Sequence, residues 1–213
     1  MPAVHKPTLY LASTNPGKLH EFREAASRRG VAVDAVPGIA GMTPCVEDGL
    51  TFEENAGKKA RYYSTLAPGL VFADDSGICV DALGGAPGVY SARFAGPGAN
   101  DEVNNAKLIE SLAPYADQQR TAHYVCVIAL AEAGRIIAVT EGRADGLILA
   151  TPRGRAGFGY DPFFLFPPLG RTFAELSPEA KFAVSHRGEA FRKLLDLVEE
   201  SEESLKSKVK SRK

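Results

Sequence analysis

The segment TLYLASTNPGKLHEFREAASRRGVAVDAV, residues 8–36, decides the fold class of this chain. Its first five residues form an apolar run typical of a buried strand, and polar and turn-forming residues follow at 13–17. Apolar side chains then recur at helical spacing over residues 18–29, Gly30 ends that pattern, and residues 31–36 predict a second strand. A strand, a glycine-containing loop, a helix and another strand in this order open an α/β fold.

Further helices and strands are predicted on the C-terminal side of this segment. Thr51 begins a helix, with Glu54 completing a capping box, and Ser177 begins another with a proline in its first turn. The apolar runs 70–73 and 78–80 predict two short strands, separated by a turn at residues 74–77. The other predicted elements are helices at 101–112 and 185–200, a hairpin of 124–130 and 135–140, strands at 146–150 and 163–166, and loops at 38–49, 84–88 and 151–162.

The chain has 213 residues, which is enough for one domain with a sizeable core. We place that single domain at residues 1–203. Residues 204–213 contain five lysines and arginines, no acidic residue and few apolar residues. This composition predicts a disordered basic tail.

Composition excludes several classes of protein. The formal net charge of −1 leaves no overall positive field to attract nucleic acid, so we expect no specific nucleic-acid partner. The three cysteines form no CxxC pair, which argues against a disulfide framework or a zinc site and favours a reducing compartment. We find no secretory signal and no apolar stretch long enough for a membrane, so a soluble cytoplasmic protein is expected.

The first polar segment that could bind a ligand is STNPGK, residues 13–18. It lies between a strand end and a helix start, where backbone N–H groups and the positive end of a helix can bind an anion. Lys18 adds a cation, although the segment is not a Walker A loop. A well-capped turn without a ligand explains the same residues.

The second is FADDSG, residues 72–77, which places two adjacent carboxylates after an apolar run. Adjacent acids repel unless a cation or hydrogen bonds compensate, and Mg²⁺ prefers one or two carboxylates together with waters and phosphates. The segment therefore predicts a metal site, with Glu47, Glu53 and Glu54 as further possible ligands. The alternative is an Asx turn that caps the strand.

Two C-terminal segments suggest a site for a nucleobase. The loop FGYDP, residues 158–162, offers aromatic rings on which a base can stack, although such rings more commonly fill a core. Lys181, Ser185, His186 and Arg187 cluster between two helical segments, and an arginine can donate to a purine edge. A solvated helix surface is the alternative for this cluster.

Several long motifs, in the same order, resemble those of the inosine triphosphate pyrophosphatases, also called dITP/XTP pyrophosphatases. They are LASTNPGKLHEF (11–22), GLTFEENAGKKA (49–60), FADDSGICVDALGGAPGVYSARFAG (72–96), GFGYDPFF (157–164) and SHRGEAFRKLL (185–195). The resemblance implies a long twisted mixed sheet flanked by helices, with two lobes and a central active-site cleft. It also implies a homodimer and hydrolysis of ITP, dITP and XTP to the monophosphate and pyrophosphate.

The resemblance assigns roles residue by residue. It makes Asp75 the catalytic carboxylate, which binds Mg²⁺ and serves as the base. Glu47 is our candidate for the second metal ligand, at a place where some relatives carry two consecutive acidic residues. The substrate-binding residues it implies are Ser13, Thr14, Asn15, Pro16, Gly17, Lys18, Asn55, Lys59, Ser76, Phe158, Gly159, Tyr160, Asp161, Lys181, His186 and Arg187.

Two other functions remain open from the sequence. One is an enzyme acting on modified pyrimidine triphosphates or on nucleotides generally. The other is a nucleotide-sensing module, or a nucleic-acid binder working through the basic tail. Adjacent carboxylates repel phosphates unless a metal intervenes, which argues against a simple binder.

Overall fold

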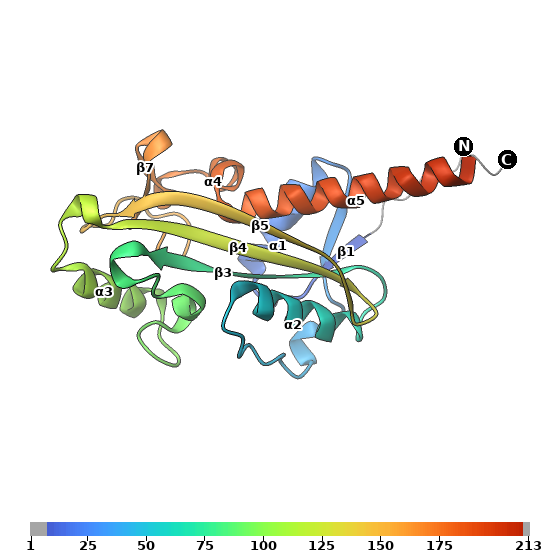
Figure 1. The fold of residues 1–213 in the computed structure, drawn as a ribbon, viewed down its shortest axis with the longest axis horizontal. Helices are drawn as coiled ribbons and strands as arrows, with labels where there is room; N and C mark the ends of the chain where they lie inside the picture. The colour runs from blue at the N-terminus through green and yellow to red at the C-terminus, as the bar shows by residue number, and fades with distance from the viewer. Residues whose placement is uncertain (1–7, 211–213) are drawn as a thin grey trace.

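The computed structural model describes residues 8–210, with side chains described for residues 8–201. A mixed sheet of seven strands, in the order β2-β1-β3-β4-β5-β6-β7, forms its centre (Figure 1). The strands are β1 (Thr8–Leu11), β2 (Ala32–Ala35), β3 (Val71–Val80), β4 (Thr121–Glu132), β5 (Arg135–Ile148), β6 (Phe164–Phe166) and β7 (Arg171–Thr172). The α-helices are α1 (Pro16–Ser27), α2 (Phe52–Ser64), α3 (Asp101–Leu112), α4 (Pro178–Val184) and α5 (His186–Lys210).

The N-terminal strand–helix–strand unit predicted from the sequence is confirmed. β1 pairs in parallel with β2 and with β3, and α1 connects β1 to β2. The side chain of Asn15 caps α1, so the helix begins at Pro16, two residues earlier than expected. Thr51 caps α2 as predicted, but the Glu54 carboxylate accepts from the Leu50 N–H rather than from Thr51.

The predicted turn at residues 74–77 is wrong, because β3 runs unbroken through this segment. β4 pairs with β3 at every position from Val71 to Val80, and this continuous antiparallel ladder outweighs the turn preference of Asp, Ser and Gly. The separate strand predicted at 146–150 is likewise the end of β5, which continues to Ile148. The long strands β3, β4 and β5 run along the length of the molecule in Figure 1.

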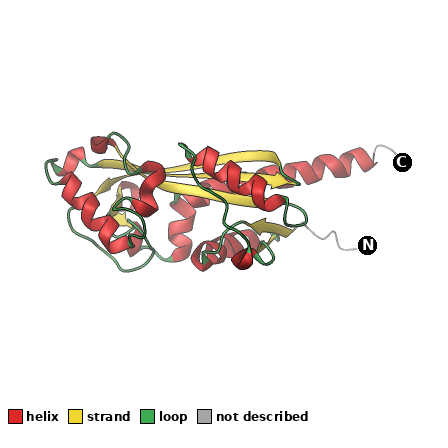
Figure 2. Ribbon diagram, turned by 90° about the horizontal axis from the view of Figure 1, so that it is seen from below, coloured by secondary structure: helices red, strands yellow, loops and turns green. Residues whose placement is uncertain are grey.

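Three apolar clusters divide the molecule into two lobes. One cluster joins the sheet to α1 and α5, and a second joins the opposite face of the sheet to α2. The third lies at the other end of the long strands, between β3, β4 and α3. Figure 2 shows helices at both ends of the long strands, as expected for two lobes.

An aromatic group in the first cluster fixes three elements that carry candidate site residues. The ring of Phe22 in α1 lies 5.1 Å from that of Phe72 in β3 and 4.7 Å from that of Phe191 in α5. Lys18 and Arg187 each precede one of these rings by one helical turn, and Asp74 follows Phe72 by two residues on the same face of β3. The packed rings therefore bring these three charged side chains together.

The start of α5 approaches β5 closely at Gly142. A Cβ atom at Gly142 would lie 2.1 Å from the backbone oxygen of His186 and 2.5 Å from the nitrogen of Ala190. Only glycine permits this contact without displacing the helix. Gly142 therefore helps to set the position of His186 and Arg187 above the sheet.

The predicted disordered tail is wrong for residues 204–210, because α5 continues as a helix to Lys210. This segment contains no proline or glycine, the two residues that most disfavour a helix interior. Residues 211–213 of the predicted tail lie outside the described residues. Among the described helices, none is long and apolar enough to cross a membrane.

Candidate active site

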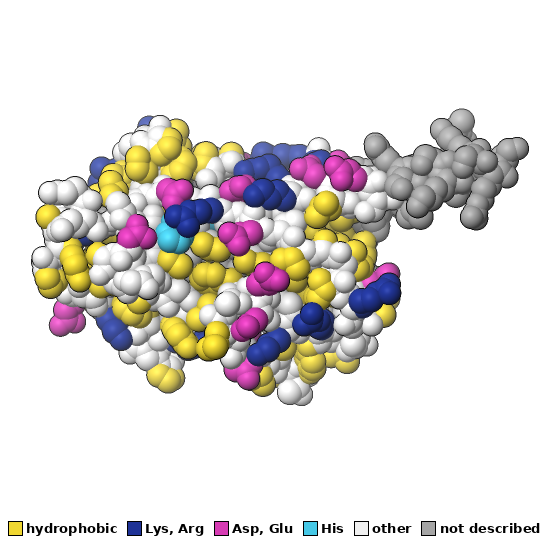
Figure 3. Space-filling model, in the orientation of Figure 1, with side chains coloured by type: hydrophobic (Ala, Val, Ile, Leu, Met, Phe, Trp, Pro, Cys, Tyr) yellow, Lys and Arg dark blue, Asp and Glu magenta, His cyan; other side chains and the backbone are white. Residues whose placement is uncertain are grey.

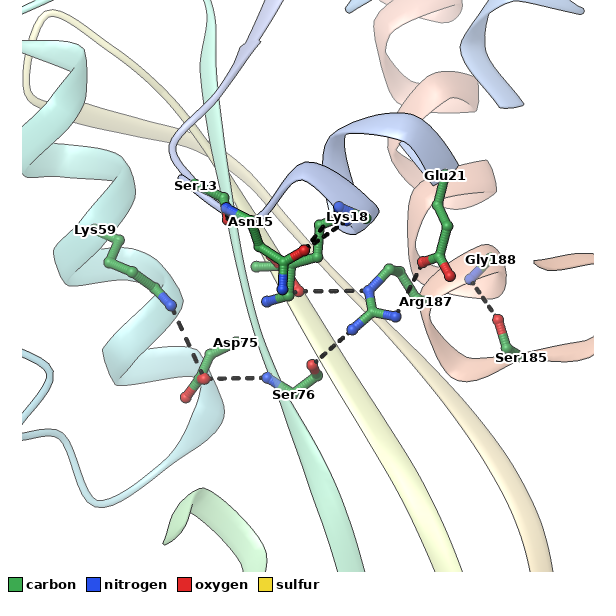
Figure 4. A network of polar contacts seen from close by, with 12 residues as sticks. Ser13, Asn15, Lys18, Glu21, Lys59, Asp75, Ser76, Ser185, Arg187 and Gly188 are labelled. Atoms are coloured by element: carbon green, nitrogen blue, oxygen red, sulfur yellow. Dashed lines mark hydrogen bonds and ion pairs between the residues drawn. The ribbon is translucent and has the colours of Figure 1, made fainter. Parts of the chain in front are cut away.

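The two aspartates of the DDSG segment lie on opposite faces of β3, just past the end of β1. β1 pairs with β3 only at Val71 and Phe72, and the loop that carries Ser13 and Asn15 lies beside the next residues of β3 (Figure 4). Successive side chains of a strand alternate between faces, so Asp74 points toward α1 and α5 while Asp75 points toward α2. The two carboxylates therefore meet different sets of side chains.

On the first face, Asp74 and its neighbours form a buried ionic cluster. Lys18 Nζ lies 2.8 Å from Asp74 Oδ2, and Arg187 Nε lies 3.6 Å from the same oxygen. Burial alone would raise the pKa of Asp74, but Lys18 and Arg187 outweigh it and hold that pKa well below its usual range. These contacts favour the ionised form of Asp74, and its carboxylate in turn positions two cations.

The Arg187 guanidinium, only 3% exposed, has further partners in this cluster. Its Nη2 donates to Ser76 Oγ over 3.2 Å, and its Nη1 lies 3.2 Å from Glu21 Oε2 (Figure 4). The predicted alternative of a solvated helix surface at residues 181–187 is therefore wrong, since Lys181, His186 and Arg187 are all buried.

On the second face, Asp75 meets residues of α2. Asn55 Nδ2 donates to Asp75 Oδ2 over 3.0 Å, and Asp75 Oδ1 accepts from the Ser76 N–H. Lys59 Nζ lies 3.9 Å from Asp75 Oδ1 and 2.8 Å from Glu47 Oε2, so one ammonium group links the two carboxylates. Burial raises the pKa of Asp75, although Lys59 and Asn55 act against that rise.

Asn55 itself is 2% exposed, and both ends of its amide are bonded. Its Oδ1 accepts from the Gly49 N–H over 2.8 Å, while its Nδ2 holds Asp75. These contacts orient Asp75 and anchor the loop that carries Glu47, rather than offering a free group to a substrate.

The loop of residues 13–18 lies where an anion site was expected. Asn15 Oδ1 accepts from the N–H groups of Gly17 and Lys18, and Asn15 N donates to Ser13 Oγ. Thr14, Pro16 and Gly17 are exposed beside it. Two donors at the start of α1 are thus already used by the cap, and Lys18 is the cation that this loop directs inward.

The FGYD loop and α4 form the other end of the site. Asp161 Oδ2 lies 2.5 Å from Lys181 Nζ and accepts from the Phe158 N–H, while Tyr160 is buried and donates its hydroxyl to Ser91 O. Phe158 is 41% exposed, and its ring centroid lies 4.6 Å from Lys181 Nζ. Tyr160 thus fills the core, whereas Phe158 offers a ring to a ligand.

His186 is buried against aromatic rings beside this loop. Its imidazole stacks on Tyr124 with 4.5 Å between ring centroids. Burial, together with the charges of Arg187 and Lys181, lowers the pKa of His186 well below its usual range, which favours the neutral ring. A neutral imidazole has one donor and one acceptor to offer to a base.

One cavity of about 330 Å³ joins these parts. Lys18 and Ser76 line one part of it, and Phe158, Lys181 and His186 line another. The cavity is large enough for much of a nucleotide, and ligand cavities of this kind combine apolar walls with a few fixed polar groups. Asp75, Lys59 and Glu47 lie on the opposite face of β3 and do not line it.

Sequence reasoning missed several residues of this arrangement. Glu21 contacts Arg187 and Tyr124 stacks on His186. The missed residues that line the cavity include Ser91, Ala92, Asp101 and Asn104. Glu21 follows Lys18 by three residues and so shares its helical face, which is a signal that could have found it. Tyr124 and Asn104 carry no comparable signal in the sequence.

Comparison with known proteins gives a consistent result. A model of the Ham1 family matches residues 9–197. The dITP/XTP pyrophosphatase of Ralstonia nicotianae is 50% identical over 194 residues, covering 88% of this chain and 94% of the relative. That of Geobacillus kaustophilus is 46% identical over 192 residues, covering 90% and 94%.

Solved structures resemble the fold equally well. The Ham1 protein of Coxiella burnetii superposes with a TM-score of 0.82 at 39% identity, covering 91% of this chain and 98% of that one. The Ham1 protein of Staphylococcus aureus gives a TM-score of 0.81 at 37% identity, covering 92% and 100%. Since the family model and these relatives span most of the sequence, the chain belongs to the Ham1 family.

Proposed function

We propose that this protein hydrolyses ITP, dITP and XTP to the nucleoside monophosphate and pyrophosphate. The observation that carries the proposal is the single cavity between Lys18 at the start of α1 and the ring of Phe158. A cation at one end suits phosphates, and an exposed ring at the other suits a base. The names of the relatives support the choice of substrates.

The proposal includes Mg²⁺ as the cofactor, held by Asp75 and Glu47. No group of three or more acidic, histidine or cysteine side chains that could hold a metal occurs among the described residues. Two carboxylates still fit Mg²⁺, which takes its remaining oxygen ligands from water and substrate phosphates. The positive charge of Lys59 between Asp75 and Glu47 indicates that this position favours a cation. When bound, Mg²⁺ would neutralise charge on the phosphate oxygens.

The protein's own residues supply positioning and proton transfer. Lys18 and Lys59, on opposite faces of β3, would hold the polyphosphate across the strand edge. Asp75 would orient the attacking water and take its proton as the bond between the α- and β-phosphates breaks and pyrophosphate leaves. Asn55 keeps the Asp75 carboxylate in one orientation for this step.

Discrimination between bases would occur beside Phe158. Hypoxanthine and xanthine present a 6-oxo acceptor where adenine presents an amine. Arg187 is a donor at this place, with its Cζ 5.4 Å from the Phe158 ring centroid. A donor facing the amine of adenine is left unpaired, and such mismatches reach selectivity factors of about 10⁴.

We also propose that the protein is a cytoplasmic homodimer. The family resemblance supports a homodimer, and the cysteine content supports a cytoplasmic location. A nucleic-acid binder is less well supported, because acidic and basic side chains are interspersed on the face seen in Figure 3.

The test is a substrate panel of ITP, dITP, XTP, ATP, GTP and modified pyrimidine triphosphates, each with Mg²⁺ and with a chelator. We expect turnover of ITP, dITP and XTP to exceed that of ATP and GTP by orders of magnitude and to require Mg²⁺. A preference for modified pyrimidines, or equal turnover of all nucleotides, would favour the alternative enzyme. Binding without turnover of any nucleotide would favour a sensing module.

A further inference from the structure

The loop that carries Phe158 is held by α3, a helix to which the proposed mechanism gives no role. The Gly159 N–H donates to Asp101 Oδ2 over 2.6 Å, and the Gly159 carbonyl accepts from Asn105 Nδ2 over 3.0 Å. Asp101 and Asn105 are four residues apart and therefore lie on one face of α3. One helical face thus binds both polar backbone groups of Gly159.

Gly159 is a place where the loop depends on such support. Its φ of +61° lies in the left-handed region, and a Cβ atom there would have nothing within 4 Å. Glycine is therefore required for its conformation rather than for lack of space, and glycine is also the residue with the most conformational freedom to lose. Contacts from α3 restrict that freedom.

The side-chain amide of Asn105 is buried and only partly hydrogen-bonded. The residue is 9% exposed, and its Oδ1 atom is buried without a hydrogen-bond partner among the described residues. The Gly159 carbonyl fixes the amide with its nitrogen toward the loop, which leaves the oxygen unpaired. A buried unpaired polar atom is unfavourable, so its presence points to a task for the nitrogen.

The position of Phe158 follows from the position of Gly159. The neighbouring Tyr160 and Asp161 are buried, so the partly exposed Phe158 ring is the part of the loop that is open to a ligand. Its distances to Lys181 and Arg187, which come from α4 and α5, depend on how α3 holds the next residue. A shift at Gly159 would move the ring away from those donors.

We propose that Asp101 and Asn105 are positioning residues for base selectivity. By holding Gly159, they place the Phe158 ring so that a stacked purine directs its polar edge toward Lys181 and Arg187. This inference rests on the proposed function, which uses Phe158 only as the stacking ring. It concerns binding of the base and not the phosphate chemistry at Asp75.

The experiment compares Asp101→Ala, Asp101→Asn and Asn105→Leu in the full chain. Asp101→Asn keeps an acceptor for the Gly159 N–H, whereas Asn105→Leu keeps the side-chain volume and removes the donor to the Gly159 carbonyl. The matched control is Glu102→Ala, which removes an exposed acid from the same turn of α3. The measurements are kcat and KM for ITP and ATP, inhibition by IMP and by pyrophosphate, and hydrogen exchange of residues 157–161.

We expect Asp101→Ala and Asn105→Leu to raise KM for ITP about tenfold, because a displaced ring loses much of its stacking contact. The value of kcat and inhibition by pyrophosphate should stay near those of the wild type, while inhibition by IMP weakens and the preference for ITP over ATP falls. Exchange in residues 157–161 should become faster. Asp101→Asn and Glu102→Ala should behave as the wild type.

Unchanged selectivity, IMP inhibition and exchange in Asp101→Ala and Asn105→Leu would overturn this inference alone, provided that the wild type prefers ITP. The inference would also be overturned if Glu102→Ala reproduced these effects, since they would then arise from loss of an acidic residue at the start of α3 and not from loss of the contacts to Gly159. A wild-type protein without preference for ITP over ATP would overturn the proposed function and this inference together.

Discussion

Asp75→Asn is expected to lower the turnover of ITP by about 10²–10⁴-fold, the usual loss when a general acid or base is removed. The substitution also removes a proposed Mg²⁺ ligand, so the upper part of that range applies. Asp75 lies in the middle of β3 rather than on a turn, and its side chain is held by Asn55 and the Ser76 N–H. The substitution nevertheless changes no backbone hydrogen bond of the strand.

The melting temperature should stay within about 3 °C of the wild type, since a change of about 1 kcal/mol shifts it by roughly 2–4 °C at this chain length. Burial raises the pKa of Asp75, which means that the folded state disfavours its charged form. The stability that this shift contributes is present at low pH and is lost as the pH rises through the pKa of the folded state. A neutral amide therefore removes an unfavourable charge at neutral pH, while Lys59 keeps Glu47 as a partner.

The measurements are the melting temperature and the rate of ITP hydrolysis with saturating Mg²⁺. Asp145→Asn is the matched control, because it makes the same chemical change on an exposed side chain of β5. Near-wild-type activity of Asp75→Asn would remove Asp75 from the mechanism.

Arg187→Ala should impair both stability and selectivity. The substitution removes a partner that the buried Asp74 shares with the partly buried Glu21, and breaking a buried ion pair costs about 3–5 kcal/mol. At this chain length, that cost lowers the melting temperature by about 10 °C. Loss of the directed donor should reduce kcat/KM for ITP strongly and narrow the gap between ITP and ATP.

Two comparisons separate these effects. Arg187→Lys restores the charge but not the planar fork that reaches Glu21 and Ser76 together, so it should recover stability better than selectivity. Phe158→Ala should instead weaken the binding of ITP, XTP and dITP to a similar extent, because any base can stack on an aromatic ring. If Arg187→Ala lowers kcat/KM for ITP and ATP by the same factor, Arg187 serves the phosphates or the fold rather than the base.

Features that depend on neighbouring residues were predictable from the sequence. The helix caps at Thr51 and Ser177 and the full extent of α3 agree with the structure, because capping and helical periodicity act over a few residues. The path of β3 was not predictable in this way. Its pairing with β4 joins residues about 50 positions apart, and that ladder overrides a local sequence typical of a turn.

For the candidate site too, the identity of the residues was predictable from the sequence, but their arrangement was not. Motif resemblance identified the residues, and the structure brings Lys18, Ser76, Phe158, Lys181, His186 and Arg187 to one cavity. The motif resemblance could not show that Asp74 and Asp75 point to opposite faces of β3. That arrangement follows from the strand that the structure has in place of the predicted turn. The support of Gly159 by α3 was also hidden, because Asp101 reads locally as an ordinary acid in the first turn of a helix.

The central claim is that the protein cleaves between the α- and β-phosphates. The most direct test is separation of the products of ITP hydrolysis by ion exchange at early times, with Mg²⁺ present. Our account predicts IMP and pyrophosphate in equal amounts, with no IDP at any time. Appearance of IDP and orthophosphate before IMP would contradict it.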